Sequence, residues 1–340
     1  MPRKPRVEYA GAFYHVMSRG DRGEAICRDD ADRDLFFKTL SEVCARTGWK
    51  VHAYVLMSNH YHLLLETPEA NLVMGMKWFL STYTLRYNAR YRQRGHVFQG
   101  RYKTVMIEPE ERGFIERVST YIHLNPLRAQ LVHWPEERLN LYRWSSCLVY
   151  MEQAKKPSWL EVMRVLDCVG VDERRGRWGR AYSEYIEKCC EEWADEQGRK
   201  ALTREWKTIR RGWFLGGDTF HERLLKSVGE QLKGKKIETY GGEEKCEHDE
   251  RAASALLAKG LDRIGLTVES LSALKKNDKR KQVLGWWLNR QACVGSEWIS
   301  NHLVMGHRTS VSKACGIVER SRDDGINRLR KKLETPKISD

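Results

Sequence analysis

Hydrophobic and polar positions recur with two different periods along the first 147 residues. Four short runs predict β-strands: AFYHVMS (12–18), WKVHAYVLM (49–57), HLLLETP (62–68) and RYKTVMIE (101–108), the last of which alternates with a period of two. Helical spacing predicts three helices, over 29–48, 71–91 and 110–126, the last of which ends near Pro126. This order predicts an α+β domain, a ferredoxin-like antiparallel sheet with helices that cover one face.

Beyond residue 147 the hydrophobic spacing is helical throughout. The charged, tryptophan-bearing stretch that follows breaks at 155–157 and at GKKIETYGGEEK, and no motif in it indicates a role. Four helix-like segments come next: ASALLAKGLDRIG, KRKQVLGWWLNRQ, SEWISNHLVMG and TSVSKACGIVERSR. We therefore predict three domains: the α+β domain over 1–147, a helical middle segment of unknown role over 148–249, and an all-α domain over 250–335.

The charge balance narrows the class of partner. Lys and Arg total 60 against 46 Asp and Glu, and the formal net charge of +14 favours a polyanion, with nucleic acid as the leading candidate. A basic membrane-surface protein is the alternative, but no segment approaches the roughly 18 apolar residues of a membrane span. The N-terminus lacks a signal-peptide core and the nine cysteines form no CxxC pair, which predicts a cytoplasmic protein with free thiols.

One segment approaches the pattern of a nucleotide-binding loop. GEQLKGKK (229–236) fits GxxxxGK, but Lys236 stands where Ser or Thr would bind magnesium, and no apolar strand precedes it. The sequence therefore predicts no nucleotide cofactor.

Two short patterns carry candidate chemistry. His60 and His62 are separated by one residue where a predicted strand begins, and in an extended strand both imidazoles project from one face and can reach one cation. Two hydrogen-bonded surface histidines fit the same spacing. Tyr121 and Asn125 are four residues apart in a predicted helix, which brings a phenol and an amide oxygen to one face. The alternative is a core tyrosine followed by an asparagine that ends the helix before Pro126.

A basic and aromatic stretch lies between these two patterns. Residues 86–103 contain no acid and six cationic residues: Arg86, Arg90, Arg92, Arg94, Arg101 and Lys103. Aromatic residues, among them Tyr91 and Phe98, are interleaved with the cations. Cations for phosphates and rings for unstacked bases predict a surface that binds single-stranded nucleic acid. A solvated helix face is the alternative, although such a face normally carries some acidic residues.

The segment SEWISNHLVMGHRTSVSKACGIVER (296–320) predicts a helix-turn-helix. Gly306 lies in the expected turn, and the second helix is expected to begin at Thr309 or Ser310. Its MGHRTSVSKA part resembles the DNA-binding end of bacterial replication initiators of the DnaA type. This interpretation places five residues nearest the DNA: His307, Arg308, Thr309, Ser310 and Lys313. An ordinary helical hairpin is the alternative.

Four motifs in one order resemble a known family. They are YHVMSRG (14–20), VLMSNHYHLLLETP (55–68), FQGRYK (98–103) and YIHLNPLRAQLV (121–132). Together, over residues 7–147, they are similar to single-tyrosine HUH transposases of the IS200 type, and among them to the REP-associated tyrosine transposases of bacterial chromosomes. The resemblance implies that His60 and His62 bind a metal and that Tyr121 is the nucleophile. The insertion-sequence relatives complete the metal site with a glutamine four residues after the tyrosine, where this sequence has Asn125.

The resemblance also implies a reaction. With Mg²⁺ or Mn²⁺ bound, Tyr121 attacks a phosphate in repetitive extragenic palindromic DNA and leaves a 5'-phosphotyrosine and a 3'-hydroxyl, which permits strand transfer without ATP. The expected partner is single-stranded and hairpin DNA, bound by a monomer or homodimer. Two rivals stay open: a catalytically inactive DNA-binding regulator derived from this family, and a metal-dependent hydrolase that uses water and needs no tyrosine.

Overall fold

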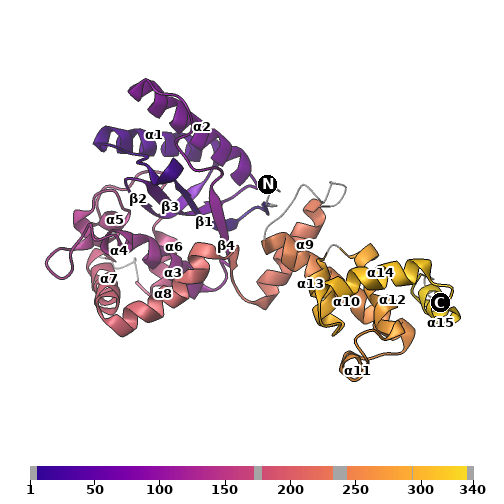
Figure 1. Ribbon diagram of the computed structural model, residues 1–340. Helices are drawn as coiled ribbons and strands as arrows, with labels where there is room; N and C mark the ends of the chain where they lie inside the picture. Colours follow the sequence, from indigo (N-terminus) through magenta and orange to yellow (C-terminus); the bar gives the residue numbers. More distant parts are fainter. Residues whose placement is uncertain (1–5, 172–177, 233–242, 293, 335–340) are drawn as a thin grey trace. The chain divides into compact units, whose positions relative to one another are not determined.

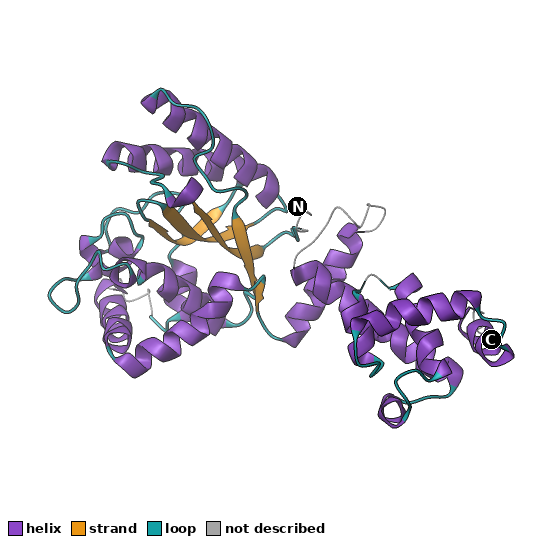
Figure 2. Cartoon of the chain, viewed as in Figure 1, coloured by secondary structure: helices purple, strands orange, loops and turns teal. Residues whose placement is uncertain are grey.

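The computed structural model describes residues 6–171, 178–232, 243–292 and 294–334. The chain divides into two compact units, residues 6–223 and residues 224–340. The strands lie in the first unit, and the described part of the second unit is helical (Figure 2). No described helix is long and apolar enough to span a membrane. The domain limits at 147 and 249 stay predictions, and residues 233–236 of GEQLKGKK lie outside the described ranges.

A five-stranded sheet in the order β2-β3-β1-β4-β5 forms the centre of the first unit. Its strands are β1 (Ala12–Arg19), β2 (Lys50–Leu56), β3 (His60–Thr67), β4 (Lys103–Ile107) and β5 (Phe214–Leu215). β1 lies between β3 and β4 and is antiparallel to both, and the predicted α+β, ferredoxin-like fold is confirmed. β5 comes from the middle segment and pairs in parallel with β4, so the sheet is mixed rather than wholly antiparallel.

Helices cover both faces of this sheet (Figure 1), whereas the sequence predicted one covered face. α1 (Asp30–Thr47) and α2 (Leu72–Tyr91) cover one face, where their aromatic side chains contact Tyr61 of β3. Against the other face lie α3 (Arg112–His123), α6 (Met163–Cys168) and α8 (Glu196–Arg211), with α4 (Asn125–Arg128), α5 (Cys147–Glu152) and α7 (Trp178–Ala194) nearby. The prediction failed because the middle segment supplies part of this layer, and its helical pattern does not reveal its partner.

Local signals account for both ends of α1 in this unit. The carboxylate of Asp29 accepts a hydrogen bond from the backbone of Asp32 at 2.9 Å and caps α1, which ends at Gly48 with a φ of 71°. One end differs from the prediction. Pro126 lies in the first turn of α4, where a missing N–H costs nothing, so Asn125 begins α4 instead of ending α3.

The described helices of the second unit enclose a separate core. They are α10 (Glu243–Ile264), α11 (Val268–Ala273), α12 (Lys279–Gln291), α13 (Ser296–His302), α14 (Arg308–Arg320) and α15 (Asp324–Glu334), while α9 (Asp218–Leu232) spans the division between the units. Trp286 and Trp287 of α12 lie in this core. The buried ammonium of Lys281 donates to the carbonyls of Leu274 and Val304, each at 3.1 Å, which ties α12 to the segment between α13 and α14. The sequence did not predict α11 or α15.

Candidate active site

β3 places the two predicted histidines on one face of the sheet. His60 begins the strand, His62 follows two residues later, and their ring centroids are 5.2 Å apart. Nδ1 of His60 lies 2.7 Å from Oδ1 of Asn59, whose amide nitrogen donates to the carbonyl of Gly23. Because the amide oxygen only accepts, Nδ1 of His60 carries the proton and Nε2 keeps the lone pair that a metal requires.

α3 brings Tyr121 against these histidines. Its ring centroid lies 5.4 Å from that of His62 and 5.6 Å from that of His15 on β1. Trp206 of α8 contacts the same ring at 5.4 Å, and the guanidinium carbon of Arg128 lies 4.5 Å from the ring centroid. Only 3% of Tyr121 is exposed. These four neighbours hold the phenol in a defined orientation.

Asn125 is oriented by the backbone that precedes it. Its Nδ2 donates to the carbonyl of Tyr121 at 2.8 Å and to that of Ile122 at 3.4 Å. Its Oδ1 accepts from the guanidinium of Arg128 at 3.3 Å. The predicted ligand atom of Asn125 therefore lies beside the tyrosine but also interacts with a cation.

These side chains line one cavity of about 580 Å³. Among its described lining residues none is a carboxylate and four are cationic: Arg19, Arg101, Lys103 and Arg128. Ser18, Asn59 and Gln99 add polar groups to the wall. The excess of positive charge suits an anion, and guanidinium groups bind phosphate oxygens particularly well.

Burial keeps the imidazoles of His60 and His15 uncharged. Burial, followed by the nearby cations Arg19 and Arg128, lowers the pKa of His60 to about 4. Burial also lowers the pKa of His15 to about 4, against the opposing effect of its hydrogen bond with the carbonyl of Ile209. Both rings are therefore neutral at pH 7, and a neutral imidazole is the form that binds a metal.

Mild acid is expected to destabilise the protein through its buried histidines. Burial also lowers the pKa of His123, which lies between the hydroxyls of Tyr182 and Ser146, to about 3. On unfolding each such pKa returns to about 6.5, so the unfolded chain binds protons first as the pH falls. The free energy of unfolding is therefore unaffected above about pH 6.5 and decreases towards pH 4, by about 1.4 kcal/mol for each pKa unit of difference.

His123→Gln tests this expectation because glutamine keeps a polar side chain and removes the titration. Calorimetric scans should show that its melting temperature falls less steeply than that of the parent between about pH 6.5 and 4.5, above the ordinary carboxyl range. His96→Gln, at an exposed histidine, is the matched control and should follow the parent. An identical slope in His123→Gln and the parent would contradict the assignment.

Two cations of the basic stretch 86–103 form ion pairs inside the domain. The guanidinium of Arg86 lies 2.8 Å from the carboxylate of Glu42. That of Arg90 lies 2.6 Å from the carboxylate of Asp29 and also pairs with the buried carboxylate of Asp32. These pairs join the end of α2 to α1, so both arginines contribute to the fold whether or not DNA is bound.

The remaining residues of this stretch differ in their surroundings. The hydroxyl of Tyr91 donates to Asp32 at 2.7 Å. Phe98 is 6% exposed and packs against Tyr61 and Tyr83, which leaves little of its ring for stacking on a base. The remaining cations, Arg92, Arg94, Arg101 and Lys103, are all exposed, and of these Arg101 and Lys103 line the cavity beside Tyr121.

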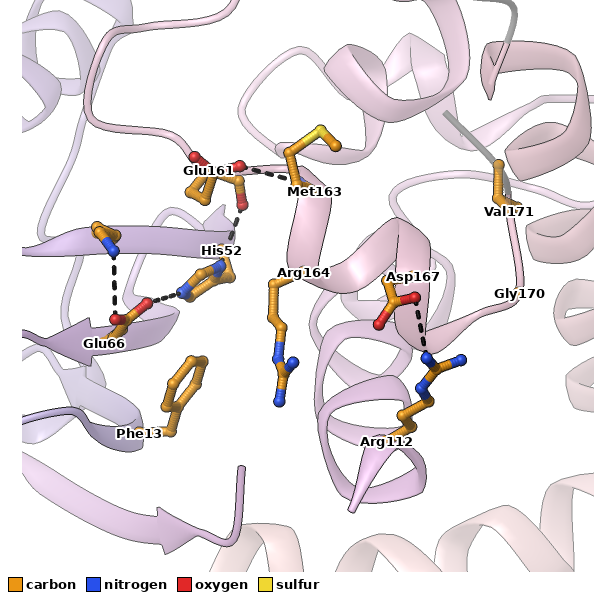
Figure 3. A pocket seen from close by; sticks show the side chains of 11 residues that line it. Phe13, His52, Glu66, Arg112, Glu161, Met163, Arg164, Asp167, Gly170 and Val171 are labelled. Carbon is orange, nitrogen blue, oxygen red and sulfur yellow. Dashed lines mark hydrogen bonds and ion pairs between the residues drawn. The ribbon is translucent and has the colours of Figure 1, made fainter. Parts of the chain in front are cut away.

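A second cavity of about 820 Å³ lies at the opposite ends of β1 and β3 (Figure 3). Glu66 accepts a hydrogen bond from His52 at 3.0 Å, which lowers the pKa of its carboxyl, and Arg112 pairs with Asp167 at 3.2 Å. Arg164 points into the cavity between these groups. The described lining balances three cations with three carboxylates: Lys50, Arg112, Arg164, Glu66, Glu161 and Asp167. This cavity therefore lacks the excess positive charge of the first.

The segment predicted as a helix-turn-helix forms two helices, α13 and α14. α14 begins at Arg308, one or two residues before the expected start, because His307 caps it and accepts a hydrogen bond from the backbone of Thr309. Gly306 lies between the helices with a φ of 87°. The predicted DNA contacts His307, Arg308, Thr309 and Lys313 are exposed, and Ser310 is half-buried. Their contact with DNA stays a prediction.

Sequence reasoning missed four residues of the site. Arg19 and Arg128 lie within two of the four motifs. Arg128 follows Tyr121 by seven residues, a spacing that would place both side chains on the same face of a helix. His15 also lies in such a motif, but nothing in the sequence indicates that it contacts His62 across the sheet. Trp206 gives no signal, because its helical segment shows no relation to the tyrosine that it covers.

Fold and cavity together indicate a domain that handles nucleic acid: a ferredoxin-like sheet with two histidines, a helical tyrosine and an excess of positive charge. Residues 9–125 match the family model described as "Transposase IS200 like". This match confirms, for this part of the chain, the resemblance to the IS200-like transposases that was inferred from the four motifs, and it supports a role in DNA processing.

The solved structures that are similar to this chain include a transposase bound to DNA. Its description is "Structure of the REP associates tyrosine transposase bound to a REP hairpin", at 14% sequence identity and a TM-score of 0.37. The similarity covers 46% of this chain and 89% of that one. No curated protein matches the sequence.

Proposed function

We propose that this protein is a metal-dependent single-strand DNA endonuclease and strand transferase that acts beside hairpins formed by REP-like palindromes. One observation carries the proposal. The ring of Tyr121 lies 5.4 Å from that of His62 in a cavity whose described lining includes four cations and no carboxylate. This arrangement supports Tyr121 as the nucleophile, the two histidines as metal ligands and the cations as the groups that bind phosphate.

The side chains present fit a divalent metal in part. Among the described residues, no group of three or more His, Cys, Asp or Glu side chains could hold a metal. The imidazoles of His60 and His62 supply two nitrogen ligands, and Oδ1 of Asn125 supplies an oxygen if it exchanges its contact with Arg128. A bound metal would neutralise charge on the scissile phosphate. We propose that Mg²⁺ or Mn²⁺ is the ion that these residues would hold.

The proposed step is a transesterification at phosphorus. The phenolic oxygen of Tyr121 attacks the phosphate, a P–O bond forms to the tyrosine, and the bond from phosphorus to the 3'-oxygen breaks. The phenolic proton is lost as the bond forms, and the leaving 3'-oxygen gains one. Arg128, which lies over the tyrosine ring, is placed to pair with the phosphate oxygens. Because the 5'-phosphotyrosine conserves the bond energy, a second 3'-hydroxyl can reverse the step and join a new strand.

A covalent adduct is the decisive test of this function. The full chain is incubated with a labelled hairpin oligonucleotide and manganese, and the products are separated under denaturing conditions. A labelled band at the mass of protein plus DNA is the expected result. Hairpin binding without any adduct would instead support the DNA-binding regulator, and nicking without an adduct would support a hydrolase that uses water.

Arg101 and Lys103 are expected to contact DNA phosphates directly, because both are exposed and line the cavity. Each phosphate contact on a single strand contributes about 0.7 to the slope of log K against log salt concentration. Arg101→Ala and Lys103→Ala should each lower this slope by about that amount in fluorescence anisotropy titrations. Arg86→Ala is the matched control: its guanidinium pairs with Glu42, so it should lower thermal stability and leave the slope unchanged. A reduced slope in Arg86→Ala alone would contradict the proposal and indicate that the DNA binds near Arg86 and not at the cavity.

We further propose that α14 supplies a second, duplex-directed contact through its exposed N-terminal residues. Arg308 and Lys313 are the cations of that face. Replacing both with alanine should weaken binding to a hairpin stem more than binding to an unstructured strand. Equal weakening for both substrates would contradict a duplex-directed role.

A further inference from the structure

His15 is a buried histidine that contacts Nδ1 of His62, one of the two proposed histidine ligands of the metal. It lies on β1, none of its side chain is exposed, and its ring stacks on that of His62 with centroids 5.0 Å apart. Nε2 of His15 lies 2.8 Å from Nδ1 of His62. Nδ1 of His15 lies 3.2 Å from the carbonyl oxygen of Ile209 in α8. Two consecutive hydrogen bonds therefore connect the middle segment to His62.

The chemistry of the carbonyl sets the direction of both hydrogen bonds. A carbonyl oxygen only accepts, so Nδ1 of His15 carries the proton that is donated to Ile209. This carbonyl lies in the last turn of α8, where helix carbonyls have no partner within the helix. Complete burial disfavours a second proton on the His15 ring. Its Nε2 is then an acceptor, and Nδ1 of His62 donates to it.

We propose that His15 is a positioning residue, which holds His62 in the tautomer whose lone pair is on Nε2. This inference rests on the proposed function of His62 as a metal ligand. Asn59 makes the equivalent contact with Nδ1 of His60, so both imidazoles have the same arrangement of donor and lone pair. Hydrogen bonds to the outer nitrogen of a ligating histidine fix its tautomer and ring orientation, and their loss typically lowers metal affinity by about 10–100-fold.

The proposal gives the middle segment a part in the site. The carbonyl of Ile209 is the group that determines which nitrogen of His15 carries the proton, and through His15 it determines the tautomer of His62. Without α8 in place, water could satisfy either nitrogen of His15. Both tautomers of His62 would then be populated, and only one of them presents the Nε2 lone pair.

Two variants of the full chain separate hydrogen bonding from packing. In His15→Gln, the side-chain amide oxygen can accept from His62 near the position of Nε2. In His15→Phe, the ring keeps its approximate volume and loses the acceptor. Titration calorimetry with Mn²⁺ is expected to show a loss of about 10–100-fold in affinity for His15→Phe and an affinity close to that of the parent for His15→Gln. Equal affinities in His15→Phe and the parent would overturn the proposal.

A second measurement needs neither metal nor catalysis. Nitrogen-15 spectra of the imidazole rings report which ring nitrogen carries a proton, and the signals of His62 are assigned by their loss in His62→Gln. In the metal-free parent we expect the proton of His62 on Nδ1. A proton on Nε2 would overturn the proposal, even where His15→Phe fails to fold. If the parent binds no manganese, the proposed role of His62 as a metal ligand is wrong. The spectra still show whether His15 holds His62 in the expected tautomer.

Discussion

Tyr121→Phe is expected to abolish the covalent protein–DNA adduct and to leave hairpin affinity close to that of the parent. The substitution removes only the phenolic oxygen, and the ring keeps its contacts with His62, Trp206 and Arg128. Loss of a catalytic residue in a hydrolytic triad lowers kcat on the order of 10⁴–10⁶-fold, so the adduct should fall below detection. Denaturing gels measure the adduct, and fluorescence anisotropy measures binding.

The matched control for this prediction is Tyr91→Phe. This change also removes one phenolic oxygen, within the basic stretch 86–103, but that hydroxyl bonds to Asp32 and lies outside the lining of the cavity. Tyr91→Phe should form the adduct as the parent does. An adduct of undiminished yield from Tyr121→Phe would show that another residue attacks the phosphate, and the proposed mechanism would be wrong.

His62→Ala is expected to remove metal binding and, with it, metal-dependent cleavage. The change leaves one imidazole and one amide oxygen that is already in contact with Arg128, which is a poor set of ligands. Because loss of a supporting hydrogen bond alone costs about 10–100-fold in metal affinity, loss of the ligand itself should exceed that range. Titration calorimetry with Mn²⁺ measures the affinity, and the adduct assay measures cleavage. His60→Ala should behave in the same way.

His96→Ala is the control for these two variants, because His96 is exposed and does not line the cavity. Its manganese affinity and adduct yield should match those of the parent. Parental manganese affinity in both His60→Ala and His62→Ala would contradict the histidine pair as the metal site. If both variants still form the adduct without added metal, attack by the tyrosine does not require a metal.

Local patterns in the sequence were sufficient for the elements from β1 to α3. Strand alternation and helical spacing depend on neighbours within a few residues, so AFYHVMS and the runs that follow it were assigned correctly. The same local geometry placed His60 and His62 on one face of β3. The order of the four motifs led to the IS200-like family, which the family match over residues 9–125 confirms.

The basic stretch shows where local patterns were insufficient. Its six cations look alike in the sequence, yet Arg86 and Arg90 pair with carboxylates of α1, while Arg101 and Lys103 line the cavity. Whether a guanidinium pairs with a carboxylate inside the domain depends on the acids that the packing of α1 against α2 brings near it. That packing joins residues 44 and 61 positions apart in the chain, separations over which periodicity carries no information.

Only the tertiary structure decided the surroundings of the tyrosine and of the histidines. α8 places Trp206 on the ring of Tyr121 and the carbonyl of Ile209 on His15, although the sequence of the middle segment indicates helices and nothing more. A helical pattern specifies an apolar face but not the surface that covers it. The sequence therefore singled out His60, His62 and Tyr121, and their roles stay predictions. Their orientation, their exposure and the tautomers that they adopt depend on contacts between distant segments, which form only when the chain is folded.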